Sequence, residues 1–383
     1  MRIAQIDPSL FTWPYDSALS LAMVEAGHDV RLFGRPPRPS EEQGAALDLL
    51  VPHFYRTLAL PVAARLPRPA FLALKGISHT FGMARLLAVL REFGPDVIHF
   101  QWSPLPAVDR RFVPSLRRIA KTVLTVHDSS PFNGTPGSSA QLAGAISIMA
   151  SFDRVIVHTD AAKTRLLGYG LVDEHIRRVP HGLLDRYPLG ATREDRKPGE
   201  PVEVLMFGYL KHYKGVDVLL RAAAAMDRVA LERTRIRIVG KPMMDLAPLH
   251  RMISDLNLGD HVTLEARFVP DEEVGGLFAR ADIVALPYRE IDASGVLMTA
   301  ITAGIPVVAS RLGLIAEMLE DGKHGRLVAP EDYSGLAGAL EEVVLSDGAR
   351  ATMSENVKAL HASIPDWDAI ARQTVDLYQE LTR

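Results

Sequence analysis

An acidic loop that leads into a helix N-terminus is the part of this chain best suited to bind a polar ligand. The loop holds Glu290 and Asp292 after the apolar run 283–286, and Ser294 and Gly295 open a short apolar helix. Ser294 is a favourable N-cap, and Gly295 leaves the free N–H groups of the first turn uncovered. These groups favour an anion, while carboxylates accept hydrogen bonds from hydroxyl groups. The pattern predicts a nucleotide sugar, or else an ordinary capped helix between buried strands.

Two lysines stand in a similar loop earlier in the chain. The apolar run 204–207 ends at Gly208, Lys211 and Lys214 follow, and a helical pattern, 216–226, begins at once. Fixed positive charge beside a helix N-terminus could hold a diphosphate. The alternative is a solvated turn with two incidental lysines, since most lysines are surface residues. Both loops follow strands of the same half of the chain, and their combination favours the binding site.

Composition limits the remaining possibilities. A chain of 383 residues with 48% apolar residues is expected to form two globular domains. A net charge of −3 gives no overall attraction to nucleic acid, and the absence of cysteine excludes disulfides and thiolate chemistry. The N-terminus, MRIAQIDPSL, is typical of a buried strand rather than a signal peptide, and no apolar run is long enough to span a membrane. We expect a cytoplasmic protein.

Short β-branched runs alternate with helical patterns, which predicts parallel α/β architecture in both halves. We expect a first domain over residues 1–185, a Pro- and Gly-rich charged linker over 186–200, a second domain over 201–366 and an amphipathic helix over 367–383 that could pack across both domains. The predicted strands are Ile3–Ile6, Asp29–Phe33, Val97–Phe100, Thr122–Val126, Val155–His158 and Arg178–Pro180, then Val202–Phe207, Arg235–Val239, Val262–Glu265, Ile283–Leu286, Pro306–Ala309 and Gly325–Val328.

Ligands of such domains bind outside the carboxyl ends of the strands. In the first domain these positions hold Asp7 with the loop PSLFTWPYD, Gln101-Trp102 and His127-Asp128. No Gly-x-Gly-x-x-Gly motif follows the first strand, which argues against a dinucleotide cofactor. A cleft between two domains with carboxyl-end loops would be a natural place for two substrates to meet.

The stretch from Val51 to Arg91 contains six Lys or Arg residues and no Asp or Glu, with aromatic residues interspersed. Such a stretch can lie on an anionic membrane surface or hold an anionic acceptor. The alternative is a solvated helical face with a Pro-rich loop between Pro61 and Pro69. Neither possibility supports recognition of nucleic acid.

Several motifs together resemble the retaining family-4 glycosyltransferases of the GT-B fold, also called group 1 glycosyl transferases. They are FGYLKHYKGVDVLL from Phe207, VPHG from Val179, VHDSSPFNG from Val126, VIVHTDAAKTRL from Val155 and SGVLMTAITAGIPVVAS from Ser294. The resemblance covers nearly the whole chain and implies two Rossmann-like domains facing a cleft.

The resemblance implies roles for individual residues on the donor side. Lys214, helped by Lys211, would neutralise the donor diphosphate, and the amides of Gly295 and Val296 would join them. Glu290 or Asp292 would orient the sugar. The remaining donor-side positions are Gly208, His181, Ser294 and Thr299, of which Thr299 stands where the family has a glutamate that contacts the ribose.

Two further positions bear on the reaction. His127 ends a strand of the first domain, and by resemblance it faces the transferred sugar; the alternative is a core histidine satisfied by the backbone. Asp366-Trp367-Asp368 has the form of a metal motif, but it opens the terminal helix, where Asp is a favourable cap. We therefore expect no metal, because lysines and helix dipoles can stabilise the developing charge.

The sequence predicts a metal-independent hexosyltransferase without a cofactor. It would move a sugar from a UDP- or GDP-linked donor to a saccharide or lipid-linked saccharide, with retention, in exopolysaccharide, capsule or lipopolysaccharide assembly. It would reside in the cytoplasm, with a possible peripheral contact to the inner face of an anionic membrane. The alternatives are a nucleotide-sugar epimerase of the same fold and a non-catalytic glycan-binding relative.

Overall fold

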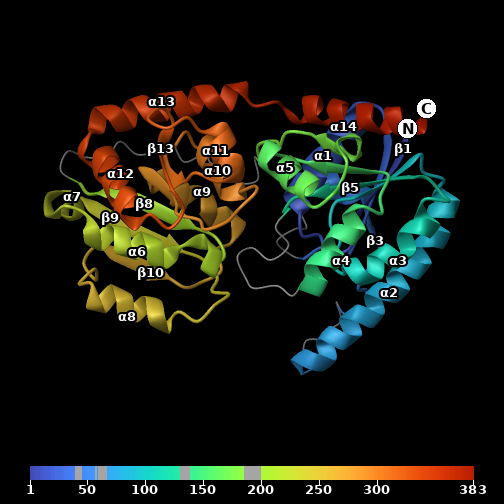
Figure 1. Cartoon of the computed structure of the whole chain (residues 1–383), viewed down its shortest axis with the longest axis horizontal. Helices are drawn as coiled ribbons and strands as arrows, with labels where there is room; N and C mark the ends of the chain where they lie inside the picture. The colour runs from blue at the N-terminus through green and yellow to red at the C-terminus, as the bar shows by residue number, and fades with distance from the viewer. Residues whose placement is uncertain (39–44, 57, 59–66, 130–138, 185–199) are drawn as a thin grey trace. The chain divides into compact units, whose positions relative to one another are not determined.

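The computed structural model describes residues 1–38, 45–56, 58, 67–129, 139–184 and 200–383 (Figure 1). The described residues divide into two compact units, one with those up to Gly182 together with Pro365–Arg383, and the other with those of Leu183–Ile364. Each unit is built on its own parallel β-sheet. The predicted α/β fold class is therefore confirmed. The predicted linker, 186–200, lies outside the described residues except for Glu200.

The first unit contains a seven-stranded parallel sheet in the order β3-β2-β1-β4-β5-β6-β7. Its strands are β1 (Arg2–Asp7), β2 (Asp29–Gly34), β3 (Leu50–Pro52), β4 (Val97–Phe100), β5 (Lys121–Val126), β6 (Arg154–Val157) and β7 (Ile176–Arg178). Its helices are α1 (Trp13–Glu25), α2 (Arg68–Phe93), α3 (Pro106–Leu116), α4 (Ser139–Met149), α5 (Asp160–Gly168) and α14 (Trp367–Thr382). The central strands are nearly continuous apolar runs because helices cover both faces of such a sheet.

The second unit contains a six-stranded parallel sheet in the order β10-β9-β8-β11-β12-β13. Its strands are β8 (Val202–Phe207), β9 (Thr234–Val239), β10 (Val262–Glu265), β11 (Ile283–Leu286), β12 (Val307–Ser310) and β13 (Gly325–Val328). Its helices are α6 (Val216–Ala225), α7 (Arg228–Glu232), α8 (Ala247–Asp255), α9 (Asp271–Arg280), α10 (Gly295–Thr302), α11 (Gly313–Met318), α12 (Tyr333–Leu345) and α13 (Asp347–Ser363).

Helix α14 belongs to the first unit although it ends the chain. It packs against α1 and β5, and its Tyr378 hydroxyl lies 2.5 Å from Nδ1 of His99 on β4. Both of these side chains are fully buried. Asp366 caps the helix by accepting a hydrogen bond from the Ala369 N–H at 2.8 Å, as the sequence predicted for an Asp at that place.

The predicted strands are confirmed to within two residues at each end, and the differences have local causes. Helix α1 begins at Trp13, because Pro14 is well suited to a first helical turn. Strand β7 ends at Arg178 rather than Pro180, because a proline has no N–H to donate to a sheet ladder. The short strand β3 was not predicted at all.

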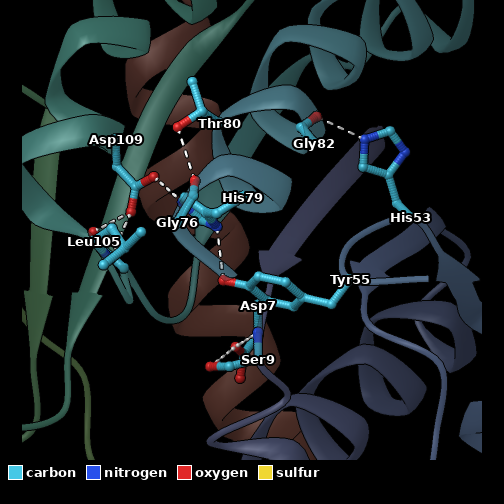
Figure 2. A network of polar contacts seen from close by, with 11 residues as sticks. Asp7, Ser9, His53, Tyr55, Gly76, His79, Thr80, Gly82, Leu105 and Asp109 are labelled. Carbon is cyan, nitrogen blue, oxygen red and sulfur yellow. Dashed lines mark hydrogen bonds and ion pairs between the residues drawn. The ribbon is translucent and has the colours of Figure 1, made fainter. Parts of the chain in front are cut away.

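A row of buried hydrogen bonds holds helix α2 in place within the first unit. The Tyr55 hydroxyl lies 2.8 Å from Nδ1 of His79, and Nε2 of His79 lies 2.5 Å from Asp109 of α3 (Figure 2). Ser103 donates a hydrogen bond to the other carboxylate oxygen of Asp109 at 2.6 Å. Because each buried polar group has a partner, the row stabilises the helix position and does not leave an unsatisfied group.

Candidate active site

The order of the second sheet reverses between β8 and β11, and ligands of open α/β sheets bind at such switch points. The loops that follow these two strands pack closely against each other. The Arg289 N–H donates to the Tyr213 carbonyl at 2.8 Å, and a Cβ atom on Gly215 would lie only 2.0 Å from the Pro287 carbonyl oxygen. Gly215 also has a φ of 71°, so this position requires glycine on two counts.

Lys214 is the central side chain of this switch point. It is only 7% exposed, and its Nζ atom donates to the Tyr288 hydroxyl at 2.9 Å and approaches the Phe207 carbonyl oxygen at 3.5 Å. Among the described residues no carboxylate forms an ion pair with it, and burial lowers the pKa of Lys214. A buried ammonium without an anionic partner is costly, so its presence indicates a site for an anion.

Gly208 leaves the approach to this ammonium open. Its φ of 109° is one that other residues rarely adopt, and a Cβ at this position would lie 3.1 Å from the Lys214 Nζ atom. One of the three N–H bonds of the ammonium points to Tyr288, so donors remain for a ligand. Lys211 is partly exposed, and its Nζ atom lies 5.8 Å from the ring centre of Tyr213 in the same loop.

Arg289 holds the two loops together, and the sequence analysis did not identify it. Its guanidinium forms a bidentate pair with Asp217 at 2.9 and 2.7 Å, and it also donates to Glu331 and to the His212 carbonyl. These bonds engage the guanidinium within the protein. Arg289 therefore positions the lysine loop and is not the residue that neutralises a ligand.

Helix α10 presents a free N-terminus beside this loop. Ser294 is its N-cap and accepts a hydrogen bond from the Leu297 N–H at 3.3 Å, which confirms the predicted cap. Among the described residues nothing accepts from the N–H groups of Gly295 and Val296. A Cβ on Gly295 would contact only Leu184, at 3.7 Å, so steric crowding does not explain this glycine.

The polar side chains around α10 differ in whether they already interact with other groups of the protein. The Thr299 hydroxyl donates to the Gly295 carbonyl at 3.0 Å, so it can offer a ligand only its lone pairs. Asp292 is buried and engaged within the protein, whereas Glu290 lies partly exposed on the loop. The structure thus brings Lys214, Gly208, Ser294 and Val296 together in the second unit.

The first unit holds a cluster of imidazoles at the carboxyl ends of β5, β6 and β7, of which His158 and His181 are buried and His127 is half-buried. Nδ1 of His158 bonds to the Val179 carbonyl at 3.0 Å, and Nε2 lies 3.2 Å from Nδ1 of His127. Because the carbonyl requires a donor, a neutral His158 carries its proton on Nδ1 and accepts through Nε2. His127 must then donate from Nδ1, which leaves its Nε2 atom as an acceptor.

That acceptor has no partner. Nε2 of His127 and Oε1 of Gln101 are buried without a hydrogen bond among the described residues. His127 comes directly after β5, and Gln101 comes directly after the neighbouring strand β4. Unpaired buried acceptors are costly, and each suits a ligand that donates from a hydroxyl group.

Burial keeps these imidazoles neutral. Together with His158, His181 and His99, burial lowers the pKa of His127 well below its ordinary value of 6.5. Burial likewise lowers the pKa of His158 to about 3 and that of His181 to about 4. Tyr15 packs against three of these rings, with ring centres 4.8 to 5.2 Å apart.

His181 lies in the same cluster of the first unit, and its predicted contact with the donor stays a prediction. Its Nδ1 atom lies 2.7 Å from the Gly182 carbonyl. The sequence analysis did not identify His158, Tyr15, Tyr288 or Arg289. His158 had a signal, because it is the last residue of a predicted strand and His127 directly follows another. Tyr288 and Arg289 act through contacts distant in sequence, which no local pattern reveals.

The fold defines a two-domain α/β protein with polar side chains gathered at the carboxyl ends of the strands in each unit. Residues 17–183 match Glycosyltransferase Family 4, and residues 191–360 match Glycosyl transferases group 1. The chain belongs to these glycosyltransferases, and the predicted family is confirmed. It is a glycosyltransferase.

Individual relatives agree with this assignment. The chain is 27% identical to a D-inositol 3-phosphate glycosyltransferase of Saccharomonospora viridis, over 96% of this chain and 88% of that protein. A Corynebacterium jeikeium protein of the same name is 34% identical over 61% of this chain and 59% of that protein. Among solved structures, Anabaena HepE in complex with UDP and glucose has a TM-score of 0.74 at 19% identity, over all of both chains. Sucrose-phosphate synthase from Thermosynechococcus elongatus has a TM-score of 0.75 at 20% identity, over 100% of this chain and 99% of that chain. These structures share the GT-B fold.

Replacement of Tyr288 by Phe should weaken nucleotide binding about tenfold, because a hydrogen bond to a charged group is worth roughly 1.5–3 kcal/mol. The substitution removes the hydroxyl that holds the Lys214 Nζ atom at 2.9 Å. Calorimetric titration with UDP and GDP measures the effect. Tyr333→Phe, at an exposed site on α12, is the control and should bind like the wild type. Equal affinity of Tyr288→Phe and wild type would show that the hydroxyl does not position the lysine.

The contribution of His158 and His181 to the stability of the first unit should fall as the pH drops below about 6.5. The folded state keeps His158 and His181 neutral down to pKa values of about 3 and 4, while the unfolded chain takes up protons near 6.5. All three tryptophans, Trp13, Trp102 and Trp367, lie in the first unit, so urea unfolding followed by tryptophan fluorescence reports on it alone.

The slope of stability against pH isolates the imidazoles from other titrating groups. His158→Gln should lose less stability than the wild type between pH 7.5 and 5, whereas His250→Gln, at an exposed position on α8, should follow the wild type. An unchanged slope in His158→Gln would contradict a neutral buried imidazole at this position.

Proposed function

We propose that this glycosyltransferase is a retaining, metal-independent hexosyltransferase. It moves a sugar from a UDP- or GDP-linked donor to the hydroxyl of a saccharide or lipid-linked saccharide. The observation that carries the proposal is the buried Lys214 ammonium, which has no carboxylate partner among the described residues and lies at the switch point of the second sheet. A departing nucleoside diphosphate is the anion that such a site would serve.

The leaving group would be stabilised by three sources of positive charge. Lys214 would contact the diphosphate, Lys211 would add a second ammonium from the same loop, and the free N–H groups of Gly295 and Val296 would complete the site. Charge stabilisation of this type usually contributes most to catalysis of group transfer. Because fixed cations and a helix N-terminus supply the charge, the proposal includes no divalent ion. The Anabaena HepE structures contain UDP and UDP-glucose, which supports a uridine donor.

The transferred sugar would be oriented by groups that match hydroxyls. Glu290 is the better candidate of the two loop acids, since Asp292 is buried and already engaged. On the first unit, Nε2 of His127 and Oε1 of Gln101 are unpaired acceptors for hydroxyl protons. Retention follows from the family resemblance, with attack from the side of the leaving group and no covalent intermediate. The role in exopolysaccharide, capsule or lipopolysaccharide assembly belongs to the same proposal.

Lys214→Ala should abolish donor binding. A thermal-shift screen of UDP, GDP, ADP and their sugars should show stabilisation of the wild type, because a ligand at 100 times its Kd adds about 2.7 kcal/mol. Lys358→Ala, at an exposed ion pair of α13, is the matched control and should keep the shift. Lack of any shift in the wild type would instead favour a non-catalytic relative.

The same preparation distinguishes the chemical alternatives. Incubation with labelled donor and acceptor should give a glycoside with the donor's anomeric configuration, and chelation of divalent ions with EDTA should leave the rate unchanged. Release of an epimerised sugar without transfer would identify an epimerase. Loss of activity with EDTA, restored by a divalent ion, would overturn the metal-independent mechanism.

We also propose that the first unit makes a peripheral contact with an anionic membrane through α2. No helix among the described residues is long and apolar enough to cross a membrane. Leu74, Ile77 and Phe81 lie on one face of α2 at intervals of three and four residues and are exposed, Phe81 by 67%. His79 holds the inner face of α2 through its bond to Asp109. Arg85 is exposed beside the apolar stripe. Basic charge around an exposed apolar stripe complements an anionic lipid surface.

The double substitution Ile77→Ser and Phe81→Ser should abolish co-sedimentation with vesicles that contain phosphatidylglycerol. The wild type should bind these vesicles, should bind weakly to pure phosphatidylcholine, and should lose affinity as salt increases. Val172→Ser, at an exposed site outside α2, is the control and should bind like the wild type. Equal binding of the wild type and the double variant would contradict a membrane role for α2.

A further inference from the structure

An aromatic pair with one exposed ring lies at the switch point of the first sheet, and the donor chemistry does not account for it. The strand order of this sheet reverses between β1 and β4. Phe11 follows β1 and Trp102 follows β4, and their rings stack with centres 4.4 Å apart and an interplanar angle of 27°. Phe11 is 64% exposed. An apolar side chain this large, held outside the core at a ligand-binding position, indicates a contact surface.

The loop that carries Phe11 is held from both sides. The buried carboxylate of Asp7 accepts hydrogen bonds from the N–H groups of Ser9 and Thr12, both at 3.0 Å, and Figure 2 shows Asp7 bonded to Ser9. Arg35 donates from Nε to the Ser9 carbonyl at 2.9 Å. The exposure of Phe11 is therefore a property of an ordered turn and not of a loose loop.

The backbone next to Phe11 is strained in order to present it. Leu10 has a φ of 48°, in the left-handed region that side chains with a Cβ disfavour. Its own side chain is buried, and it occupies the space beside Gly34, where a Cβ would lie 2.4 Å from the Leu10 Cδ2 atom. Leu10 thus points into the core while Phe11 points outward. Such strain persists where the surrounding structure enforces it, and it collects at functional sites.

The chemistry around the pair favours an uncharged ring as its ligand. Arg35 is already engaged with the carbonyls of Ser9 and Pro36, and Asp7 is an acceptor. The unpaired acceptors Gln101 Oε1 and His127 Nε2 follow the adjacent strands β4 and β5. One face of a pyranose ring presents C–H groups that pack on the electron-rich face of an aromatic ring, while its hydroxyls donate from the edge. A phosphate would find no free guanidinium on the Phe11 loop.

We infer that Phe11 and Trp102 form a platform on which the pyranose ring of the acceptor saccharide stacks. The inference rests on the proposed function, because it assigns the acceptor site of that reaction. It selects a saccharide over a small phosphorylated cyclitol such as the D-inositol 3-phosphate in the names of the relatives. Phe11 and Trp102 are then specificity-determining residues that contact the acceptor and take no part in proton transfer.

Tryptophan fluorescence tests the platform directly. The full chain is titrated with the methyl α- and β-pyranosides of glucose, galactose and mannose and with D-myo-inositol 3-phosphate, with and without UDP. At least one pyranoside should change the emission of the wild type, and the change should be absent in Trp102→Phe. Phe11→Ala should raise the Kd about fivefold to tenfold, which corresponds to the loss of one aromatic stacking contact.

Two further variants separate stacking from a general effect. Phe11→Tyr keeps the ring and should bind within about twofold of the wild type. Val172→Ala removes an equally exposed side chain that precedes the amino end of β7, and it should bind like the wild type. Because Phe11 is exposed, Phe11→Ala should unfold at the wild-type temperature.

The inference is overturned if no pyranoside changes the emission, if Phe11→Ala binds as tightly as the wild type, or if only inositol phosphate binds. These outcomes are distinct from failure of the proposed function. That failure appears as a missing thermal shift with every nucleotide, and the shift does not depend on Phe11, which belongs to the first unit.

Discussion

The desolvation of one ammonium group determines much of the second unit. Lys214 is buried without a carboxylate partner among the described residues, so the folded protein bears a cost that only an anionic ligand relieves. The residues around Lys214 hold the ammonium group in this buried position. Gly215 lets the two loops approach to backbone contact, Arg289 ties them together, and Tyr288 fixes the Nζ atom. A surface lysine would need none of these neighbours, which is why the pattern argues for a binding site.

The two units use the same topology for different chemistry. Each parallel sheet reverses its strand order at one point, between β1 and β4 in the first unit and between β8 and β11 in the second. At the second unit's switch point the available groups are a cation and free N–H groups, which suit an anion. At the first unit's switch point they are stacked aromatic rings, with neutral imidazoles and unpaired acceptors on neighbouring strands. Under the proposed function, the chain would separate the recognition of charge from the recognition of hydroxyl groups.

Sequence patterns predicted the fold because parallel strands buried on both faces must be apolar almost throughout. They located Lys214 and Ser294 for a related reason, since strand ends and helix caps have local signatures. They missed Tyr288 and Arg289 because the partners Lys214 and Asp217 are over seventy positions away in the chain. The donor contact that they predict for His181 stays a prediction. The motif around it indicates proximity to a substrate but does not indicate which sheet edge it joins, and the structure places it beside His158 in the first unit.

The threonine in α10 shows why a departure from a family pattern need not abolish binding. A glutamate at position 299 would place negative charge one turn from the free N–H groups of Gly295 and Val296. Thr299 removes that charge, and its hydroxyl is bonded to the Gly295 carbonyl at 3.0 Å, so the anion meets an undiminished helix dipole. What the site loses is a strong acceptor for a ribose hydroxyl. The expected consequence is a donor site that gains more of its affinity from the diphosphate and less from the nucleoside than a glutamate-containing relative would.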